Sequence, residues 1–238
     1  MKSTKYEEKY MPLLEHIEEL KNRIILTFLI FIVLLSLCLV YTKQICGVLQ
    51  QPALGIKFLQ LAPGEYLFVS IKIATYTAIF ITSPFMLYQA IKFISPGLTK
   101  KENQYVIPTS IFSLCLFFIG IVFSYKTIIP ITLNFFINYG SNIIEPIWSF
   151  EQYFNFISFT LLSTGICFQL PVLQIILGLT KIIKWETMLK QWKYITFIAT
   201  IISAIITPST DPITQLFMTF TIVILYMIGI LILKTIEK

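Results

Sequence analysis

Long apolar runs separated by short charged stretches form the main pattern of this chain. Six runs contain no Asp, Glu, Lys or Arg, and they cover residues 24–42, 73–91, 103–125, 152–180, 194–207 and 212–233. A helix rises about 1.5 Å per residue and the hydrocarbon core of a bilayer is about 30 Å thick, so about 20 apolar residues cross it. The pattern therefore predicts an all-α polytopic membrane protein with six transmembrane helices in one domain, residues 1–238.

Two of the runs have unusual lengths. The fourth has 29 residues and carries Gln169 and Pro171 near its centre, and a proline there removes a helical hydrogen bond, which predicts a bend. The fifth has only 14 residues, so its hairpin with the sixth is predicted to be too short for an undisturbed bilayer. A further uncharged stretch, residues 127–144, holds a proline, a glycine and three asparagines, which indicates a loop that caps one face.

The segment before the first run is amphipathic. Within residues 12–23, apolar side chains recur at positions 13, 14, 17 and 20, which predicts an amphipathic helix that leads into the first span. Its polar face carries Glu15, Glu18 and Glu19. One interpretation is a solvated face on which Glu19 pairs with Arg23 one turn further on. The other is an acidic pocket, formed with Glu102 at the start of the third run, that binds a pair of guanidinium groups.

Charged residues are few and unevenly distributed. They make up 13% of the chain, against roughly 25% in a soluble domain, so a water-soluble fold is excluded. Segments on the N-terminal side of the membrane carry 14 Lys and Arg, and those on the other side carry 4. Because basic residues concentrate on the side where a membrane protein is made, both termini are predicted to be cytoplasmic or stromal. The net charge of +6 is thus mostly a topology signal.

The residues offer little for catalysis. There is one histidine, and the four cysteines have no CxxC spacing and mostly lie within apolar runs, so no metal or cofactor is expected. The chain lacks the common nucleotide-binding and hydrolase motifs, so it is not predicted to be an enzyme. No ionisable residue lies within the six runs, which argues against a proton relay. A passive solute channel or a transporter permease subunit remains an alternative.

Six groups of short motifs follow one another along the chain. They are residues 16–23; Ser83-Pro84 with Tyr88-Gln89; residues 93–98 with Glu102; Gly120 with Phe123 and Tyr125; residues 168–171; and Thr207-Pro208 with Asp211 and Gln215. Together they resemble the TatC family, the receptor and core subunit of the twin-arginine protein translocase. The resemblance covers nearly the whole chain.

This resemblance implies a concave, glove-like scaffold of six helices with short fifth and sixth helices. It implies that the protein recognises signal peptides with consecutive arginines and assembles with single-span partners of the TatA and TatB type, and with further copies of itself. Folded proteins then cross the membrane on the proton-motive force. By position, the resemblance assigns signal-peptide binding to Glu19, Glu102, His16, Lys21, Arg23 and Gln169, and structural or translocation roles to Phe93, Pro96, Pro171, Pro208, Asp211 and Gln215.

Two positions depart from the pattern of many members. Lys21 stands where many have arginine, and a lysine cannot form a bidentate pair with a carboxylate. Gln169 stands where many bacterial members have glutamate, and in this it is similar to the cyanobacterial and plastid branch. Together with heavy use of Ile, Lys and Phe, this predicts a plastid thylakoid protein, with the bacterial inner membrane as the alternative.

Overall fold

The structure is a computed structural model that describes residues 13–94, 100–140, 145–179, 182–206 and 212–236. Almost all of them are helical, as predicted. The helices are α1 (Leu13–Val40), α2 (Thr42–Gln50), α3 (Glu65–Ile94), α4 (Lys100–Phe123), α5 (Ile129–Gly140), α6 (Phe150–Cys167), α7 (Leu170–Leu179), α8 (Trp185–Lys190), α9 (Trp192–Ile206) and α10 (Pro212–Ile236). Two short turns, η1 (Gln51–Ala53) and the π-helical η3 (Ser124–Ile128), and two strands, β1 (Lys57–Leu59) and β2 (Ile147–Ser149), complete the described fold.

Membrane-crossing helices account for most of the described chain. Five stretches of helix are long and apolar enough to cross a bilayer, and α9 is a shorter apolar helix, which confirms the six-span prediction. The fifth span is short, because the 15 residues of α9 extend only about 22 Å. The expectation of a short sixth helix is wrong, since α10 has 25 residues and its apolar pattern continues almost to its end.

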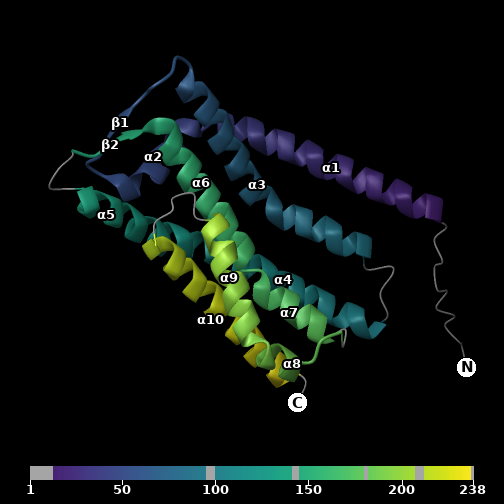
Figure 1. The fold of residues 1–238 in the computed structure, drawn as a ribbon. Coiled ribbons are helices and arrows are strands. Elements are labelled where there is room, and N and C mark those ends of the chain that lie inside the picture. Colours follow the sequence, from purple (N-terminus) through teal and green to yellow (C-terminus); the bar gives the residue numbers. More distant parts are fainter. Residues whose placement is uncertain (1–12, 95–99, 141–144, 180–181, 207–211, 237–238) are drawn as a thin grey trace, which may run out of the picture.

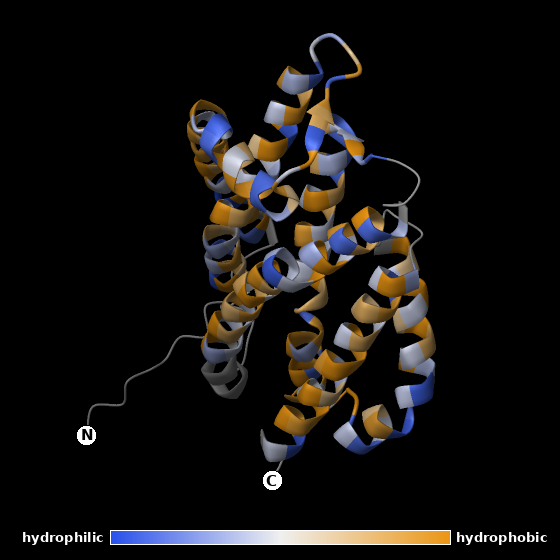
Figure 2. Ribbon diagram, turned by 90° about the vertical axis from the view of Figure 1, so that its left-hand side faces the viewer, coloured by the Kyte–Doolittle hydropathy of each residue, from blue (hydrophilic) through white to orange (hydrophobic). Residues whose placement is uncertain are grey.

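The spans are arranged around two antiparallel helix pairs. Figure 1 shows α1 beside α3 on one side and α9 beside α10 on the other, with α4 and α6 between the two pairs. The short elements α2, β1 and β2 gather at one end, called here the cap end. Figure 1 places the start of α1 and the end of α10 at the opposite end, called here the terminal end, and Figure 2 shows that the helices between the two ends are largely hydrophobic. This agrees with the prediction that both termini lie on one side of the membrane.

The predicted capping loop over residues 127–144 is wrong for most of its length, because α5 fills Ile129–Gly140. Pro130 lies just after the π-helical turn η3, where the Ile129 N–H donates to the Ser124 carbonyl, and the helix continues through it. Ile129 and Leu133 are buried in the core, whereas Asn134 and Asn138 are exposed. The polar residues therefore occupy one face of an amphipathic helix and do not interrupt it.

The predicted bend in the fourth span is confirmed as a break. Helix α6 ends at Cys167 and α7 begins at Leu170, so the chain leaves the helix just before Pro171. Pro171 has no N–H to offer the carbonyl of Cys167, which removes one bond of the ladder. Helix α7 then packs closely on α10, because Gly178 and Gly229 have no side chains to hold the two helices apart.

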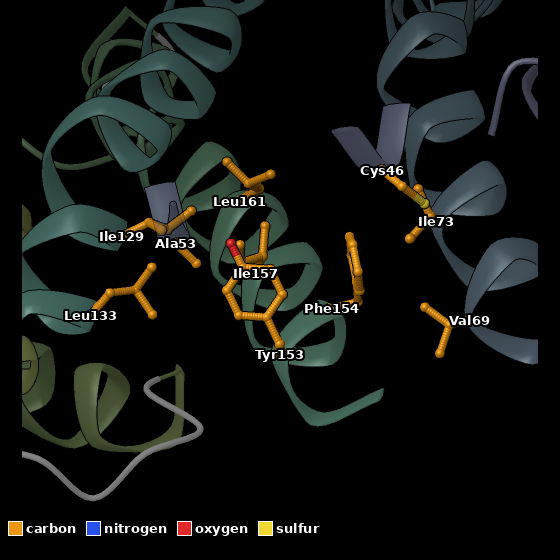
Figure 3. Close-up of a cluster of buried hydrophobic side chains, with 10 residues drawn as sticks. All are labelled: Cys46, Ala53, Val69, Ile73, Ile129, Leu133, Tyr153, Phe154, Ile157 and Leu161. Carbon is orange, nitrogen blue, oxygen red and sulfur yellow. The ribbon is translucent and has the colours of Figure 1, made fainter. Parts of the chain in front are cut away.

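The largest buried cluster lies beneath the cap end. Strand β1 pairs in parallel with β2, and the Tyr153 hydroxyl of α6 donates to the Leu49 carbonyl of α2 at 2.8 Å. The cap is therefore fastened to the membrane helices by backbone and side-chain hydrogen bonds. Figure 3 shows the cluster gathered around α6; its buried members are Cys46, Ala53, Val69, Ile73, Ile129, Leu133, Tyr153, Phe154, Ile157 and Leu161.

Candidate functional site

A polar cavity of about 460 Å³ lies at the terminal end, where the start of α1 meets the end of α3. It is called here the acidic cavity, because it has three carboxylates against two cations. Helical spacing brings its α1 residues onto one face. Its lining consists of Glu15, Glu18, Glu19, Asn22, Arg23 and Leu26 from α1, and Gln89 and Lys92 from α3.

The centre of the acidic cavity is an ion pair between Glu19 and Arg23. Arg23 Nε donates to Glu19 Oε1 at 3.0 Å, and Arg23 Nη2 donates to the same oxygen. This confirms the interpretation of the sequence in which these residues pair one helical turn apart. Arg23 Nη1 also donates to Gln89 Oε1 at 2.9 Å, so the same guanidinium links α1 to α3.

The two carboxylate oxygens of Glu19 differ in their contacts, because Oε1 accepts from Arg23 and Oε2 does not. Glu19 Oε2 is buried and has no hydrogen-bond partner among the described residues. The His16 Nδ1 atom lies 4.0 Å from it, which is an ion pair only when the imidazole is protonated. The carboxylate therefore has one oxygen committed to a guanidinium and one oxygen that can accept a further donor.

Two aromatic contacts support the walls of the cavity. The His16 ring stacks on the Phe93 ring, with the ring centres 4.2 Å apart and the planes inclined by 13°. Lys92 Nζ lies 5.8 Å from the centre of the Tyr88 ring. His16 and Phe93, both predicted from the sequence, thus meet in a single contact between α1 and α3. Lys21 is exposed and is not part of the cavity lining.

Several predicted site residues fall outside the described part of the structure. Glu102 belongs to the first turn of α4, but its side chain is not among those described. The convergence of Glu19 and Glu102 on one pocket therefore stays a prediction. Pro96, Pro208 and Asp211 also lie outside the described residues. Gln215 is described, and its amide nitrogen donates to the Thr200 carbonyl at 3.4 Å, which ties α10 to α9.

Gln169 lies apart from the acidic cavity, at the break between α6 and α7. Its amide accepts from Ser113 Oγ at 2.5 Å and donates to the Ser113 carbonyl at 3.1 Å. An amide can form both bonds without the desolvation cost of a buried charge. Gln169 therefore fastens the broken fourth span to α4. Nothing in the sequence pattern indicated Ser113 as its partner.

Sequence reasoning assigned no site role to two residues of α3. Gln89 and Lys92 lie one helical turn apart at the terminal end of that helix, and both line the acidic cavity. The available signal was an amide placed just before the end of an apolar run, three positions ahead of a lysine. Among the described residues, no group of three or more His, Cys, Asp or Glu could hold a metal ion.

Five long apolar helices and a shorter one, with an acidic cavity at one end, define a multi-pass membrane protein rather than a soluble binding domain. Residues 15–220 match the family model described as Sec-independent protein translocase protein (TatC). The match covers most of the chain, and the chain therefore belongs to the TatC family.

Related proteins agree with this assignment. The chain is 57% identical to an uncharacterized tatC-like protein, ycf43, of Gracilaria tenuistipitata var. liui, over 96% of both chains. It is 43% identical to the Sec-independent protein translocase protein TatC of Synechocystis sp., over 92% of this chain and 87% of that one. A crystal structure of the twin-arginine translocase receptor TatC in DDM superposes with a TM-score of 0.80 at 31% identity, covering 91% of this chain and 98% of that one.

The protein is thus a multi-pass membrane subunit of the twin-arginine translocase. This confirms the function predicted from its motifs, and it favours protein translocation over the solute channel or permease subunit.

Proposed function

We propose that the acidic cavity is the receptor site for the arginine pair of twin-arginine signal peptides. The observation that carries the proposal is the Glu19–Arg23 pair, because it shows that this carboxylate accepts a guanidinium in the geometry of the cavity. Glu15 and Glu18 are exposed at the same site and form no ion pair with any described residue. A ligand that carries two guanidinium groups meets these unpaired carboxylates, and a side-chain rotation of Glu19 presents its buried, unsatisfied oxygen to the same ligand.

Each residue of the site has its own role in this proposal. Glu19 binds one ligand guanidinium through Oε2, and Glu102, from the first turn of α4, supplies the second carboxylate. Arg23 orients Glu19 and, through Gln89, holds α1 against α3. His16 adds positive charge beside Glu19 when it is protonated, and Lys21 stays at the rim. Binding in this arrangement needs no metal and no cofactor.

The apolar part of the signal peptide follows the inner face of the scaffold past Gln169. The Ser113–Gln169 pair supports this part of the proposal, because it places a neutral amide at the α6–α7 break and keeps α4 and α7 together. Single-span partners of the TatA and TatB type, and further copies of the chain, complete the assembly. Plastid thylakoids are the proposed location, and the bacterial inner membrane is the alternative.

The short helix α9 is the proposed place for a partner helix. Its 15 residues extend about 22 Å, whereas the hydrocarbon core measures about 30 Å, so the bilayer thins beside it. Its outward side carries an apolar stripe of exposed side chains, among them Tyr194, Phe197, Ile201 and Ile205. A partner helix that packs here covers apolar surface that faces lipid in the isolated subunit.

Crosslinking of a photoreactive twin-arginine peptide to the full chain in membranes tests the receptor site. Glu19→Gln and Glu102→Gln each keep the side-chain shape and remove the charge. Losing one charged hydrogen-bond partner costs about 1.5–3 kcal/mol, so each variant should weaken crosslinking about ten- to a hundredfold. Glu186→Gln is the control, because Glu186 is exposed in α8, in the connection between the fourth and fifth spans.

An unchanged crosslinking yield in both Glu19→Gln and Glu102→Gln would remove the docking proposal. An equal loss in Glu186→Gln would show that the membrane face attracts the peptide through general charge and not through this cavity. A peptide with two lysines in place of the arginines provides the ligand control, since lysine cannot engage a carboxylate bidentately.

The proposed role of α9 is tested by lengthening it. Insertion of four residues adds about 6 Å and brings α9 close to the thickness of the hydrocarbon core. Transport of a folded reporter should then fall, while protease protection shows that the variant still adopts six spans. Undiminished transport would refute the thinning proposal without affecting the receptor site.

A further inference from the structure

A second cavity, of about 390 Å³, lies beneath the cap end, far along α3 from the acidic cavity. It is called here the cap cavity. Its walls come from α2, α3, α6 and the end of α4 with η3, and they are almost entirely apolar. Representative wall residues are Val48 of α2, Phe80 of α3, Ile121 of α4 and Leu161 of α6.

Two tyrosines hold α2 in place above the cap cavity. The Tyr125 hydroxyl donates to the Val48 carbonyl at 2.6 Å, and the Tyr153 hydroxyl donates to the Leu49 carbonyl at 2.8 Å. Both carbonyls belong to the last turn of α2, where few intrahelical donors remain, and the Val48 carbonyl also accepts from the backbone N–H of Gln51. Because these bonds fix α2 above α3 and α6, the cap cavity is a built space with defined walls.

The cap cavity is large enough to hold part of a ligand, and it opens between the helices. The volume of 390 Å³ falls within the range of ligand pockets, roughly 300–1,000 Å³, which are lined by apolar side chains with a few polar groups. An apolar space of this kind offers water few partners, whereas a hydrocarbon chain fills it well.

One cation lies at the rim of the cap cavity. Lys126 directly follows the third apolar run, is exposed, and forms no ion pair with any described residue. Lys72 on the same side of the membrane differs, because its Nζ lies 2.9 Å from Glu151 Oε1. The π-helical turn η3 holds Lys126 beside Tyr125 at the cavity, and such turns are frequent at functional sites.

We propose that the cap cavity binds one acyl chain of an anionic glycerolipid, whose charged headgroup pairs with Lys126. The apolar walls favour a hydrocarbon chain, and Lys126, which forms no ion pair with any described residue, attracts a negative headgroup. Lys126 reaches the headgroup level because a lysine extends its apolar stem along the helix and leaves its ammonium at the interface. The lipid comes from the leaflet on the cap side and fills the space between α2, α3, α4 and α6. This inference does not depend on the proposed receptor site.

Photolabelling of the full chain in nanodiscs tests this proposal. The probes are phosphatidylglycerol and phosphatidylcholine that each carry a diazirine in one acyl chain, within a phosphatidylcholine bilayer. Labels should map to α3, α4 and α6 around Phe80, Ile121 and Leu161. Phosphatidylglycerol should label about fivefold more strongly, which is the selectivity expected from one lysine near the membrane surface.

Three variants distinguish the contribution of the lipid headgroup to binding from that of the acyl chain. Lys126→Gln should abolish the preference for phosphatidylglycerol and leave labelling by phosphatidylcholine unchanged. Lys43→Gln is the matched control, because Lys43 is exposed on α2 but does not line the cap cavity, and it should keep the preference. Thr77→Phe places a ring within the cavity wall and should reduce labelling by both lipids.

Equal labelling by the two lipids in the unmodified protein would overturn the proposal. So would an equal effect of Lys43→Gln and Lys126→Gln, or labels confined to other helices. A large excess of soluble glycerol phosphate should not compete, because it lacks the chain that the apolar walls bind, and effective competition would assign the site to a free phosphate. Lys126 is exposed, so its replacement leaves the fold intact and keeps the comparison valid.

Discussion

Gly229 lies where α10 crosses the first turns of α7, and we predict that Gly229→Ala destabilises this crossing. A Cβ atom at this position would lie 1.8 Å from Gln174 Oε1 and 3.0 Å from the Cα atom of Pro171. Gln174 is only 6% exposed, so its amide must move aside within the α7–α10 interface, and the Pro171 contact is backbone. Overpacking of this kind costs about 1–3 kcal/mol.

A second glycine provides the matched control. Gly47 lies inside α2, and a Cβ atom there would meet nothing within 4 Å. Alanine is favoured over glycine within a helix by roughly 0.5–1 kcal/mol, and this gain applies to both variants. The difference in stability between Gly229→Ala and Gly47→Ala therefore isolates the steric cost at the α7–α10 crossing.

Thermal unfolding in detergent, followed with a thiol-reactive dye, measures this difference. Cys38, Cys46 and Cys167 are buried and become reactive when the helices separate, whereas Cys115 is exposed and should be replaced by serine in all variants. Gly229→Ala should unfold several degrees below Gly47→Ala. Equal unfolding temperatures would refute the reasoning, because they would show that α7 and α10 separate without cost.

Three further changes test contacts that join distant elements. Glu65 is buried and accepts three backbone N–H groups at 2.6–3.0 Å, so Glu65→Ala should lower stability by about 3 kcal/mol in the same assay, and Glu65→Gln by less. Tyr153→Phe removes only the bond to the Leu49 carbonyl and should cost about 1 kcal/mol. Gln89→Leu removes the acceptor of Arg23 Nη1, so amide exchange in the first turns of α1 should accelerate about fivefold while exchange in α9 stays unchanged.

The spans were predictable because the bilayer imposes a length and a composition on any helix that crosses it. Charges therefore located all six spans along the chain. Helix α3 nevertheless begins at Glu65, ahead of the predicted start at residue 73, because Lys72 pairs with Glu151 and does not end the helix. The bend in the fourth span was predictable for a similarly local reason, the absence of an N–H at Pro171.

Helix α5 was missed because composition outweighed periodicity in the prediction. Asparagine and glycine favour turns, yet Asn134 and Asn138 are four positions apart and face the same way. Ile129 and Leu133 have the same spacing and face the core. The helical period was therefore present in the sequence, and it should have outweighed the average polarity of the stretch.

The acidic cavity was predictable only on its α1 side. Glu19 and Arg23 are four positions apart in one helix, so their pairing follows from helical geometry. Gln89 reaches Arg23 from 66 positions further along the chain, and Ser113 reaches Gln169 from 56 positions away. Contacts at such separations depend on how the spans pack in three dimensions, and the apolar runs carry no information about that packing.

The ion pair between Glu19 and Arg23 explains why the proposed site suits a pair of arginines better than a single cation. Arg23 already neutralises Glu19 through Oε1, so a lone cation at Oε2 gains little net attraction. Glu15 and Glu18 form no ion pair among the described residues. A ligand with two adjacent guanidinium groups can use the fixed acceptor at Glu19 for orientation and the unpaired carboxylates for attraction. In the proposed receptor site, Arg23 is therefore the residue that disfavours ligands with a single positive charge.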